Sequence, residues 1–275
     1  MEKIKIIALD MDGTTLNNEK RITEETLSAI KKAHQQGILI VPATGRSLSG
    51  LPKELIELPI RYSILKNGAI VYDLLKKEEI YHDIIDNDLV SKFADATKDL
   101  MTFTSIGYGE QKEACYSPNK DLLYKLHPTS KRNENLFVDD LSLFIKQHNP
   151  KIDKITQIVF DQQTADIILK LQEQFLDLNI MNSGYPFIEI NSRMCSKGNG
   201  LKKLATKLNL TRENIAAIGD SDNDIIMLAY AGYSFAMANG TQFIRNIADE
   251  ITDDNNHQGV KKAIEKILTL NQKCL

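Results

Sequence analysis

The stretch Lys3–Leu16, KIKIIALDMDGTTL, decides how the rest of the chain is interpreted. A short apolar run stops at Asp10, and Asp12 follows two residues later, just before the turn residue Gly13. An apolar run of this length, bounded by turn residues, is typical of a strand buried on both faces. Ligands bind at the carboxyl ends of strands in open parallel sheets, so this pattern places two carboxylates where a ligand would lie. The alternative is an acidic turn that only caps the next element.

Composition narrows the class of protein. The 275 residues suffice for one large domain or two ordinary ones. Hydrophobic residues make up 42% of the chain and charged residues 26%, which is usual for a globular protein. The formal net charge of −3 comes from 34 basic and 37 acidic residues without a strongly basic stripe. We therefore expect no nucleic acid as a partner, and nothing in the sequence implies a protein partner.

Neither a membrane span nor a disulfide framework is expected. No apolar run approaches the roughly 20 residues that a membrane helix needs. The apolar run near the N-terminus is interrupted by Asp10, which argues against a signal peptide. The three cysteines are scattered without a CxxC spacing, so we expect reduced thiols in a cytoplasmic protein.

The order of elements predicts an α/β fold. Strand-like runs over 4–9, 38–43 and 62–65 are separated by a helix that begins at Thr23, whose side chain can cap it, and by a second helix expected over 47–57. This alternation is typical of a Rossmann-like, doubly wound parallel sheet. The rhythm changes near residue 84 and resumes after the hairpin-like segment 179–191. We therefore expect a discontinuous α/β core over 1–83 and 189–275, with an inserted α+β cap domain over 84–188.

Further polar residues follow other expected strands. Thr44-Gly45-Arg46 follows the second strand, the acidic run Asp220–Asp224 follows a later strand, and Lys197 stands at a helix start. Strand ends of a parallel sheet share one edge, so these side chains can converge with Asp10. Several carboxylates together favour a hard cation, and Mg²⁺ suits one or two carboxylates plus a substrate phosphate.

The same set contains donors for phosphoryl oxygens, namely a threonine hydroxyl, a lysine ammonium and an asparagine amide. The chain has no GxxxxGK[ST] loop, which argues against nucleotide triphosphate hydrolysis on a P-loop. The pattern instead favours phosphoryl transfer through a carboxylate nucleophile.

Four short motifs together resemble those of the haloacid dehalogenase superfamily: DMDGT (10–14), ATGR (43–46), SKG (196–198) and GDSDND (219–224). Their order and spacing, and the place of the insert after the third strand, resemble the Cof-type sugar-phosphate phosphatases with a large α+β cap. The resemblance spans the whole chain.

This resemblance implies a role for each matching residue. Asp10 would attack phosphorus and become an aspartyl phosphate. Asp12 would protonate the leaving oxygen and later take a proton from the hydrolytic water. Mg²⁺ would be held by Asp10, the backbone carbonyl of Asp12, and Asp220.

The remaining roles concern the phosphoryl group and its surroundings. Thr44, Lys197 and Asn223 would hold phosphoryl oxygens. Asp224 would orient Lys197 or a metal-bound water. For Arg46, both a substrate contact and a structural ion pair stay open.

These observations predict a Mg²⁺-dependent phosphohydrolase that acts on a small phosphorylated metabolite such as a sugar phosphate. One alternative is a phosphomutase or phosphotransferase that uses the same aspartyl phosphate. A second is a non-catalytic, metal-dependent binding module, against which the intact Asp10 and Asp12 pair argues.

Overall fold

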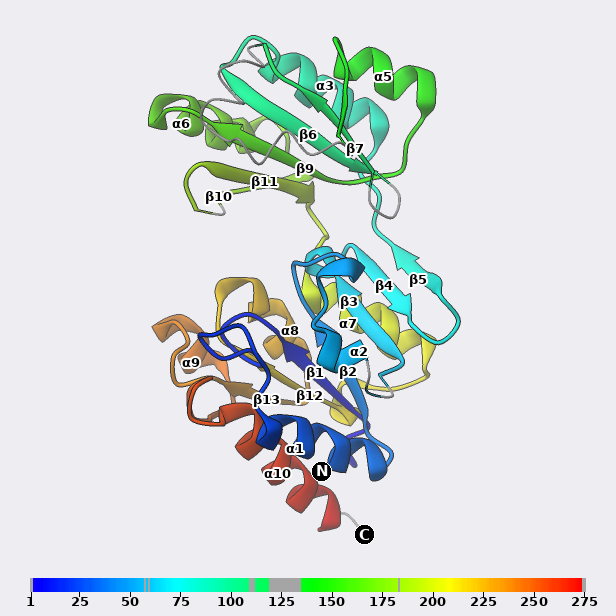
Figure 1. Cartoon of the computed structure of the whole chain (residues 1–275), viewed down its shortest axis with the longest axis vertical. Helices are drawn as coiled ribbons and strands as arrows, with labels where there is room; N and C mark the ends of the chain where they lie inside the picture. Colours follow the sequence, from blue (N-terminus) through cyan, green and yellow to red (C-terminus); the bar gives the residue numbers. More distant parts are fainter. Residues whose placement is uncertain are drawn as a thin grey trace. The chain divides into compact units, whose positions relative to one another are not determined.

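The computed structural model describes residues 2–56, 58, 60–108, 112–118, 135–182 and 184–273. The chain divides into two compact units, Met1–His82 with Ser196–Leu275, and Asp83–Cys195 (Figure 1). The first crossing lies one residue before the expected boundary at 83/84, whereas the second lies beyond the expected boundary at 188/189. The reason is strand β11 (Phe187–Ser192), which pairs with β9 and β10 of the inserted unit and so keeps the chain there until Cys195.

The first unit is built on one eight-stranded sheet in the order β14-β13-β12-β1-β2-β3-β4-β5. The strands from β14 to β3 are parallel, and β4 and β5 add an antiparallel hairpin at one edge. The predicted doubly wound parallel sheet is thereby confirmed. The strand bounds are β1 (Ile6–Asp10), β2 (Leu39–Ala43), β3 (Tyr62–Leu65), β4 (Ile70–Asp73), β5 (Glu78–His82), β12 (Ile215–Gly219), β13 (Tyr233–Ala236) and β14 (Glu250–Ile251).

Strand β1 lies in the middle of this sheet, at the point where the strand order reverses. The chain continues from β1 to β2 on one side, and β12 occupies the other side. A reversal of this kind leaves a crevice at the carboxyl ends of the neighbouring strands, where α/β proteins bind ligands. The fold therefore directs attention to the loops after β1 and β12.

Helices cover both faces of the sheet. The helices of this unit are α1 (Glu24–Gln35), α2 (Lys53–Ile56), α7 (Lys197–Lys207), α8 (Ile225–Tyr230), α9 (Gln242–Ile247) and α10 (Gly259–Gln272). Thr23 accepts a hydrogen bond from the Thr26 backbone N–H and so caps α1, as predicted.

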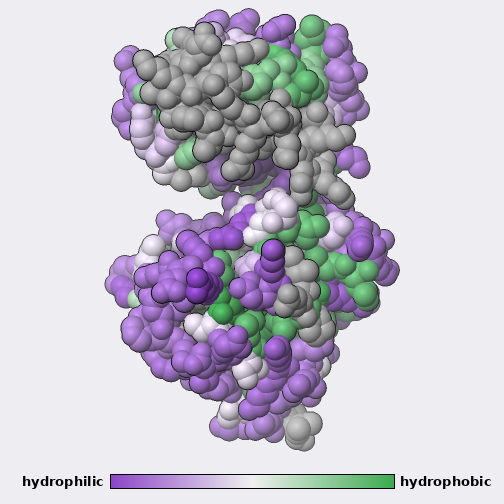
Figure 2. Space-filling model, in the orientation of Figure 1, coloured by the Kyte–Doolittle hydropathy of each residue, from purple (hydrophilic) through white to green (hydrophobic). Residues whose placement is uncertain are grey.

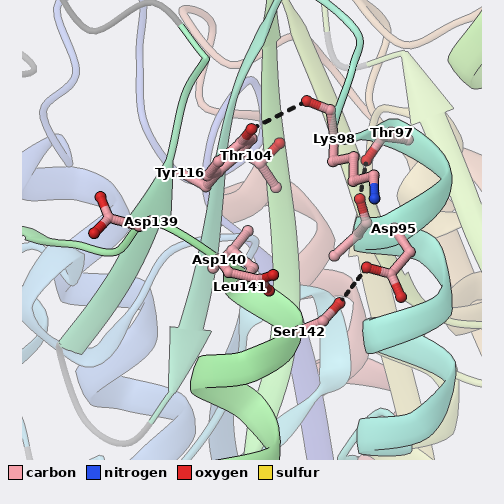
Figure 3. Close-up of a pocket in the computed structure, with 10 residues that line it drawn as sticks. Asp95, Thr97, Lys98, Thr104, Tyr116, Asp139, Asp140, Leu141 and Ser142 are labelled. Carbon is pink, nitrogen blue, oxygen red and sulfur yellow. Dashed lines mark hydrogen bonds between the residues drawn. The ribbon is translucent and has the colours of Figure 1, made fainter.

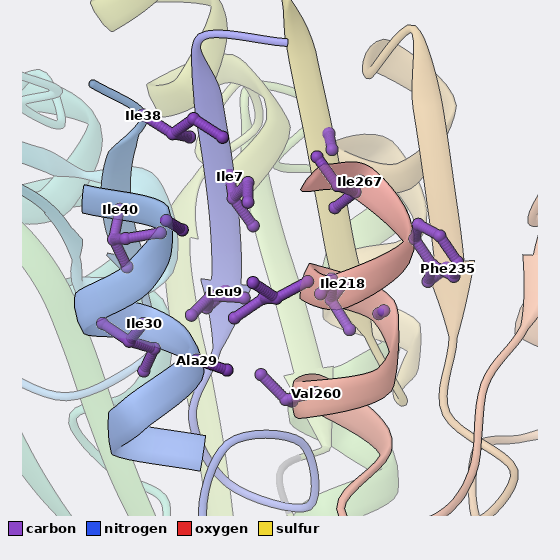
Figure 4. Close-up of a cluster of buried hydrophobic side chains, with 14 of the residues drawn as sticks. Ile7, Leu9, Ala29, Ile30, Ile38, Ile40, Ile218, Phe235, Val260 and Ile267 are labelled. Carbon is purple, nitrogen blue, oxygen red and sulfur yellow. The ribbon is translucent and has the colours of Figure 1, made fainter. Parts of the chain in front are cut away.

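Side chains of β1 point alternately to the two faces of the sheet. Ile7 and Leu9 pack with side chains of α1 and α10 in one buried cluster (Figure 4). Ile6 and Ala8 belong to the opposite cluster, which contains Leu201 of α7. Because side chains alternate along a strand, Asp10 follows Ile6 and Ala8 toward the face that α7 covers.

The helix predicted over 47–57 is wrong. The structure has a 3₁₀ turn at Leu48–Gly50 and then the four-residue helix α2. Pro52 separates them, because proline disfavours helical backbone in the residue before it, and Leu51 is extended at φ −68° and ψ 140°. Residue 57 lies outside the described residues.

The second unit is an α+β domain with a six-stranded sheet in the order β10-β11-β9-β6-β7-β8. Its pairs are antiparallel except for β7 with β8. The helices pack their apolar side chains against one face of this sheet. The bounds are α3 (Asn87–Thr97), β6 (Thr102–Tyr108), β7 (Lys112–Tyr116), β8 (Asn135–Phe137), α5 (Leu141–His148), β9 (Ile152–Val159), α6 (Gln162–Lys170), β10 (Leu178–Asn182) and β11.

A polar cavity of about 40 Å³ lies in this second unit between α3, the start of α5, and strands β6 and β7 (Figure 3). Ser142 Oγ donates to Asp95 Oδ1 at 2.8 Å, and Tyr116 Oη donates to the Lys98 carbonyl at 3.2 Å. This volume has room for a few water molecules and is too small for a phosphorylated metabolite.

The structure bears on the expectations about membrane helices and about the cysteines. None of the helices in the described ranges combines the length and apolar character needed to cross a bilayer. Among the described residues, Cys115 and Cys195 are buried and neither forms a disulfide, while Cys274 lies outside those residues. The visible surface of the first unit is mostly hydrophilic (Figure 2), although Leu75, in the turn between β4 and β5, is 75% exposed.

Candidate active site

The candidate site begins where β1 and β12 end. These strands are parallel neighbours, with Leu9 opposite Ile218, so Asp10 and the residue after Gly219 reach the same edge of the sheet. Ala43 of β2 is paired with Asp10, which places Thr44 beside it at this edge. The structure thus brings together the three strand ends that were predicted to carry polar residues.

Three carboxylates gather at this edge. Asp10, Asp220 and Asp224 each offer an oxygen, and these oxygens lie within 4.8 Å of one another. Asp10 and Asp224 are almost completely buried. Like charges at this separation raise each other's energy unless cations offset them.

Lys197 supplies one cation to the cluster. Its Nζ lies 2.6 Å from Asp10 Oδ1 and 2.7 Å from Asp224 Oδ1, and its side chain is 1% exposed. Ser196 places the lysine by capping α7, since its hydroxyl accepts a hydrogen bond from the Asn199 N–H. The lysine therefore joins β1 to the loop after β12.

Burial and charge shift the proton affinities of this cluster. Burial raises the pKa of Asp10 to about 6 although Lys197 opposes the rise, and the Asp220 carboxylate adds to it. Burial and the nearby Asp10 carboxylate likewise raise the pKa of Asp224 to about 6. Burial alone would lower the pKa of Lys197, but the two carboxylates raise it above its ordinary value. The cluster therefore holds more negative charge than one lysine neutralises.

Some carboxylate oxygens remain available to a second cation. Among the described residues, the buried Asp10 Oδ2 has no hydrogen-bond partner. Asp220 Oδ1 accepts a hydrogen bond from Thr14 Oγ1 at 2.8 Å, and burial raises the pKa of Asp220. Hard oxygen ligands of this kind suit Mg²⁺, so the residues present fit the predicted metal.

Gly13 allows the two acidic loops to meet. Its φ of +85° lies in the left-handed region, and a Cβ there would overlap the Asp220 carboxylate. Only glycine satisfies both conditions without strain.

Asp12 occupies a different environment from Asp10. It is exposed, and Arg46 donates two hydrogen bonds to it, from Nε to Oδ2 at 2.8 Å and from Nη2 to Oδ1 at 2.6 Å. Lys20 Nζ adds a contact at 3.0 Å to Oδ1. The hydrogen bonds from Arg46, followed by those from Lys20, lower the pKa of Asp12. The two neighbouring carboxyls therefore have opposite pKa shifts, and the lowered pKa of Asp12 favours its ionised form while Arg46 contacts it. The sequence had pointed to Arg46 but not to Lys20.

The predicted phosphate-binding side chains differ in their exposure. Thr44 is buried, and its Oγ1 accepts a hydrogen bond from the Arg46 N–H at 3.2 Å. Asn223 is exposed, and its Nδ2 donates to Asn67 Oδ1 at 3.1 Å. Lys197 is the member of this set that lies within the acid cluster.

Asp224 also shapes the loop that carries Asp220. Its Oδ2 accepts hydrogen bonds from the backbone N–H of Asp220 at 3.0 Å and of Ser221 at 3.1 Å. Its other oxygen contacts Lys197, so a single side chain organises both the loop and the lysine.

The sequence interpretation had not assigned Asn67 or Asn239 to the site. Asn239 Nδ2 donates to the Gly13 carbonyl at 2.8 Å and supports the turn after β1. Asn67 contacts Asn223 from the loop after β3. The only signal for either residue is an Asn-Gly pair after an expected strand, which by itself indicates a turn.

The parallel sheet extends to both sides of the central strand β1, which ends at Asp10. A lysine-bridged cluster of carboxylates lies where the strand order reverses, and an α+β unit is inserted into the chain. This fold and site indicate a hydrolase. A family model described as haloacid dehalogenase-like hydrolase matches residues 7–264. The chain therefore belongs to the haloacid dehalogenase-like hydrolases, and it is an enzyme of the phosphatase class.

Individual relatives agree over nearly the full length. A Streptococcus pyogenes protein, which its name assigns provisionally to the phosphatases, is 31% identical over 96% of this chain and 98% of its own. The Bacillus subtilis 5-amino-6-(5-phospho-D-ribitylamino)uracil phosphatase YcsE is 30% identical over 95% of this chain and 94% of its own. The solved structure of the phosphatase BT1666 from Bacteroides thetaiotaomicron superposes with a TM-score of 0.81 at 25% identity, covering 96% of this chain and 95% of that one.

Proposed function

We propose that this protein is a Mg²⁺-dependent phosphohydrolase that cleaves the phosphate monoester of a small metabolite through an aspartyl phosphate on Asp10. The observation that carries the proposal is the state of the Asp10 carboxylate. One oxygen is held by Lys197 at 2.6 Å, and the other is buried without a hydrogen-bond partner among the described residues. A buried carboxylate that is fixed at one oxygen is suited to nucleophilic attack.

The metal would be held by the side chains of Asp10 and Asp220 and by the backbone carbonyl of Asp12. When bound, Mg²⁺ supplies positive charge that reduces repulsion between a carboxylate nucleophile and a phosphate and stabilises the transition state. The excess negative charge of the acid cluster supports this assignment.

In the first step an Asp10 oxygen forms a bond to phosphorus while the bond to the leaving oxygen breaks. Asp12 donates a proton to that oxygen, so the product leaves as an alcohol. In the second step Asp12 takes a proton from water, which attacks phosphorus, and the Asp10 carboxylate is released together with inorganic phosphate.

The phosphoryl oxygens would be held by the Thr44 hydroxyl, the Lys197 ammonium and the Asn223 amide. Charge-assisted and neutral donors that are fixed before the substrate arrives lower the cost of organising the transition state. Asp224 supports this role of Lys197 by accepting a hydrogen bond from its ammonium at 2.7 Å.

Arg46 would position Asp12 by the two-pronged contact described above. Its Nη1 donates to the Gly50 carbonyl at 3.0 Å, which anchors the guanidinium from behind. A planar guanidinium held in this way fixes the direction of the Asp12 carboxyl.

The substrate class rests on the relatives. The name of YcsE assigns it a substrate with a phosphorylated ribityl chain, which is a primary phosphate monoester on a polyol. We propose that this chain also acts on a phosphorylated sugar or a similar small metabolite.

The proposal is tested by assaying the purified protein on 4-nitrophenyl phosphate and a panel of sugar phosphates, polyol phosphates and nucleotides. We expect turnover with Mg²⁺, loss of turnover with a chelator, and loss in the Asp10→Asn variant. No turnover by the intact protein across the panel would overturn the proposal. Transfer of the phosphoryl group to a sugar hydroxyl in place of water would identify a phosphotransferase.

A further inference from the structure

The loop Lys66–Gly68, directly after β3, has an unusual backbone. Lys66 and Asn67 both have left-handed φ angles, at +50° and +56°, and Gly68 follows at +99°. Two consecutive non-glycine residues in this region are rare, and such strain gathers at functional sites. The sequence identifies this loop only as the end of a strand.

The backbone of this loop is attached to the loop after β2. The Lys66 N–H donates to the Arg46 carbonyl at 3.0 Å, and the Asn67 N–H donates to the Thr44 carbonyl at 2.9 Å. A Cβ on Gly45 would lie 3.1 Å from Asn67 Oδ1, so glycine allows the Asn67 side chain to approach. The strained loop therefore fixes the position of the proposed phosphate ligand Thr44.

The other side of the loop lies against the start of α7. A Cβ on Gly68 would overlap the Ser196 carbonyl, which precedes Lys197. A Cβ on Gly200 would in turn lie 3.2 Å from the Gly68 Cα. The loop after β3 therefore touches the backbone next to two of the three proposed phosphate ligands.

The Asn67 side chain contacts the third ligand. Its Oδ1 accepts a hydrogen bond from Asn223 Nδ2 at 3.1 Å, while Asn223 Oδ1 accepts one from Ser221 Oγ at 2.8 Å. These two contacts act on opposite ends of the Asn223 amide. Together they decide which end of that amide carries the N–H donors.

We propose that Asn67 is a positioning residue for phosphate binding. It holds the donor end of the Asn223 amide in place through its side chain and holds the Thr44 loop through its backbone. The left-handed backbone at Asn67 is what brings the side chain to Asn223 while its N–H reaches Thr44. This inference rests on the proposed function, because it assumes that Asn223 and Thr44 receive phosphoryl oxygens.

The variant Asn67→Gly separates the side chain from the backbone, because glycine keeps the left-handed conformation without strain. The measurement is isothermal titration of inorganic phosphate into the Mg²⁺-loaded protein. We expect phosphate to bind roughly threefold to tenfold more weakly to Asn67→Gly, as for the loss of one orienting hydrogen bond. Asn209→Gly is the control, since Asn209 is an exposed asparagine that also has a left-handed φ, at +53°.

A double-mutant cycle with Asn223→Ala decides whether Asn67 acts through Asn223. We expect the double variant to bind phosphate no more weakly than Asn223→Ala alone, with thermal melting showing that each variant is folded. Additive losses, or an Asn67→Gly variant with unchanged phosphate affinity, would overturn the inference. An intact protein that binds no phosphate would overturn it too.

Turnover of 4-nitrophenyl phosphate by the intact protein reports on the proposed function separately. Coupled phosphate binding without turnover would overturn the phosphatase proposal and still support the positioning role of Asn67.

Discussion

Lys197 Nζ lies 2.6 Å from Asp10 Oδ1 and 2.7 Å from Asp224 Oδ1, so one buried ammonium joins two buried carboxylates from different strand ends. Asp220 brings a third carboxylate to the same place. One lysine offsets part of this charge, and the proposed Mg²⁺ would offset the remainder. These contacts join the end of β1, the loop after β12 and the start of α7 at one edge of the sheet.

The first prediction concerns the lysine. Lys197→Met leaves two buried carboxylates without their cation, so we expect the protein to lose about 3 kcal/mol of unfolding free energy at pH 8. Urea denaturation measures the change. Lys202→Met, at an exposed position of the same helix, is the control and should differ by less than about 0.5 kcal/mol from the intact protein. A loss below about 1 kcal/mol for Lys197→Met would contradict the buried ion cluster.

The second prediction concerns the turn after β1. Gly13→Ala combines a left-handed φ with a clash against the Asp220 carboxylate, so we expect it to displace that carboxylate. Titration with Mn²⁺ in place of Mg²⁺ should show affinity weakened by roughly tenfold or more, as when a metal ligand loses its support.

Gly37→Ala provides a matched control for Gly13→Ala. Gly37 also has a left-handed φ, at +79°, but a Cβ there meets nothing within 4 Å. We expect it to cost about 1 kcal/mol of stability through backbone strain alone and to bind Mn²⁺ normally. Equal Mn²⁺ affinities for the two variants would refute the role of Gly13.

The third prediction separates the two aspartates of the turn. If Asp12 protonates the leaving oxygen, Asp12→Asn should lower kcat/KM for an alkyl phosphate by roughly 10²–10⁴. The loss should be much smaller for 2,4-dinitrophenyl phosphate, whose leaving group needs no proton. Steady-state kinetics on both substrates measure the difference. An equal loss on both would show that Asp12 does not act as the acid.

The fourth prediction concerns how pH changes the stability of the hairpin formed by β4 and β5. Asp73 is buried at the end of β4, and although burial opposes it, hydrogen bonds from the backbone of Lys76 and from Arg61 lower the pKa of Asp73. A lowered pKa in the folded state adds stability above the ordinary value of about 3.9, and that stability is lost as the pH falls through the folded pKa.

Asp73→Asn should therefore reduce the unfolding free energy by about 2 kcal/mol at pH 7 and by progressively less as the pH falls below about 4. Urea denaturation across this range measures the difference. Glu78→Gln, on the same hairpin and exposed, should change stability by less than about 0.5 kcal/mol. A destabilisation by Asp73→Asn that is the same at pH 3 and pH 7 would contradict the assigned linkage.

Local sequence patterns predicted the elements that combine a clear period with a clear end. The apolar run before Asp10 and the capping residue Thr23 are read correctly because burial and capping act within a few residues. The helix expected over 47–57 failed because Pro52 interrupts the segment, and Ser49 and Gly50 before it are also poor helix formers. The second domain boundary was placed too early because pairing of β11 with β9 depends on residues far apart in the chain.

The convergence of the acidic residues could be foreseen, because parallel strand ends share one edge. The particular partners could not. Three contacts depend on side-chain directions across loops: Arg46 with Asp12, Lys20 with Asp12, and Asn67 with Asn223. Such contacts carry no periodic signal, so only the folded chain reveals them.

The most direct test of the central claim is to find the phosphoryl group on Asp10. The Asp12→Asn protein, mixed with Mg²⁺ and 2,4-dinitrophenyl phosphate and quenched in acid, should hold the intermediate because it lacks the base that activates water. Peptide mass spectrometry should then show one phosphoryl group on Asp10 that hydroxylamine removes. Turnover by the intact protein with no phosphoryl group on Asp10 in this variant, or with the group on another residue, would contradict the account.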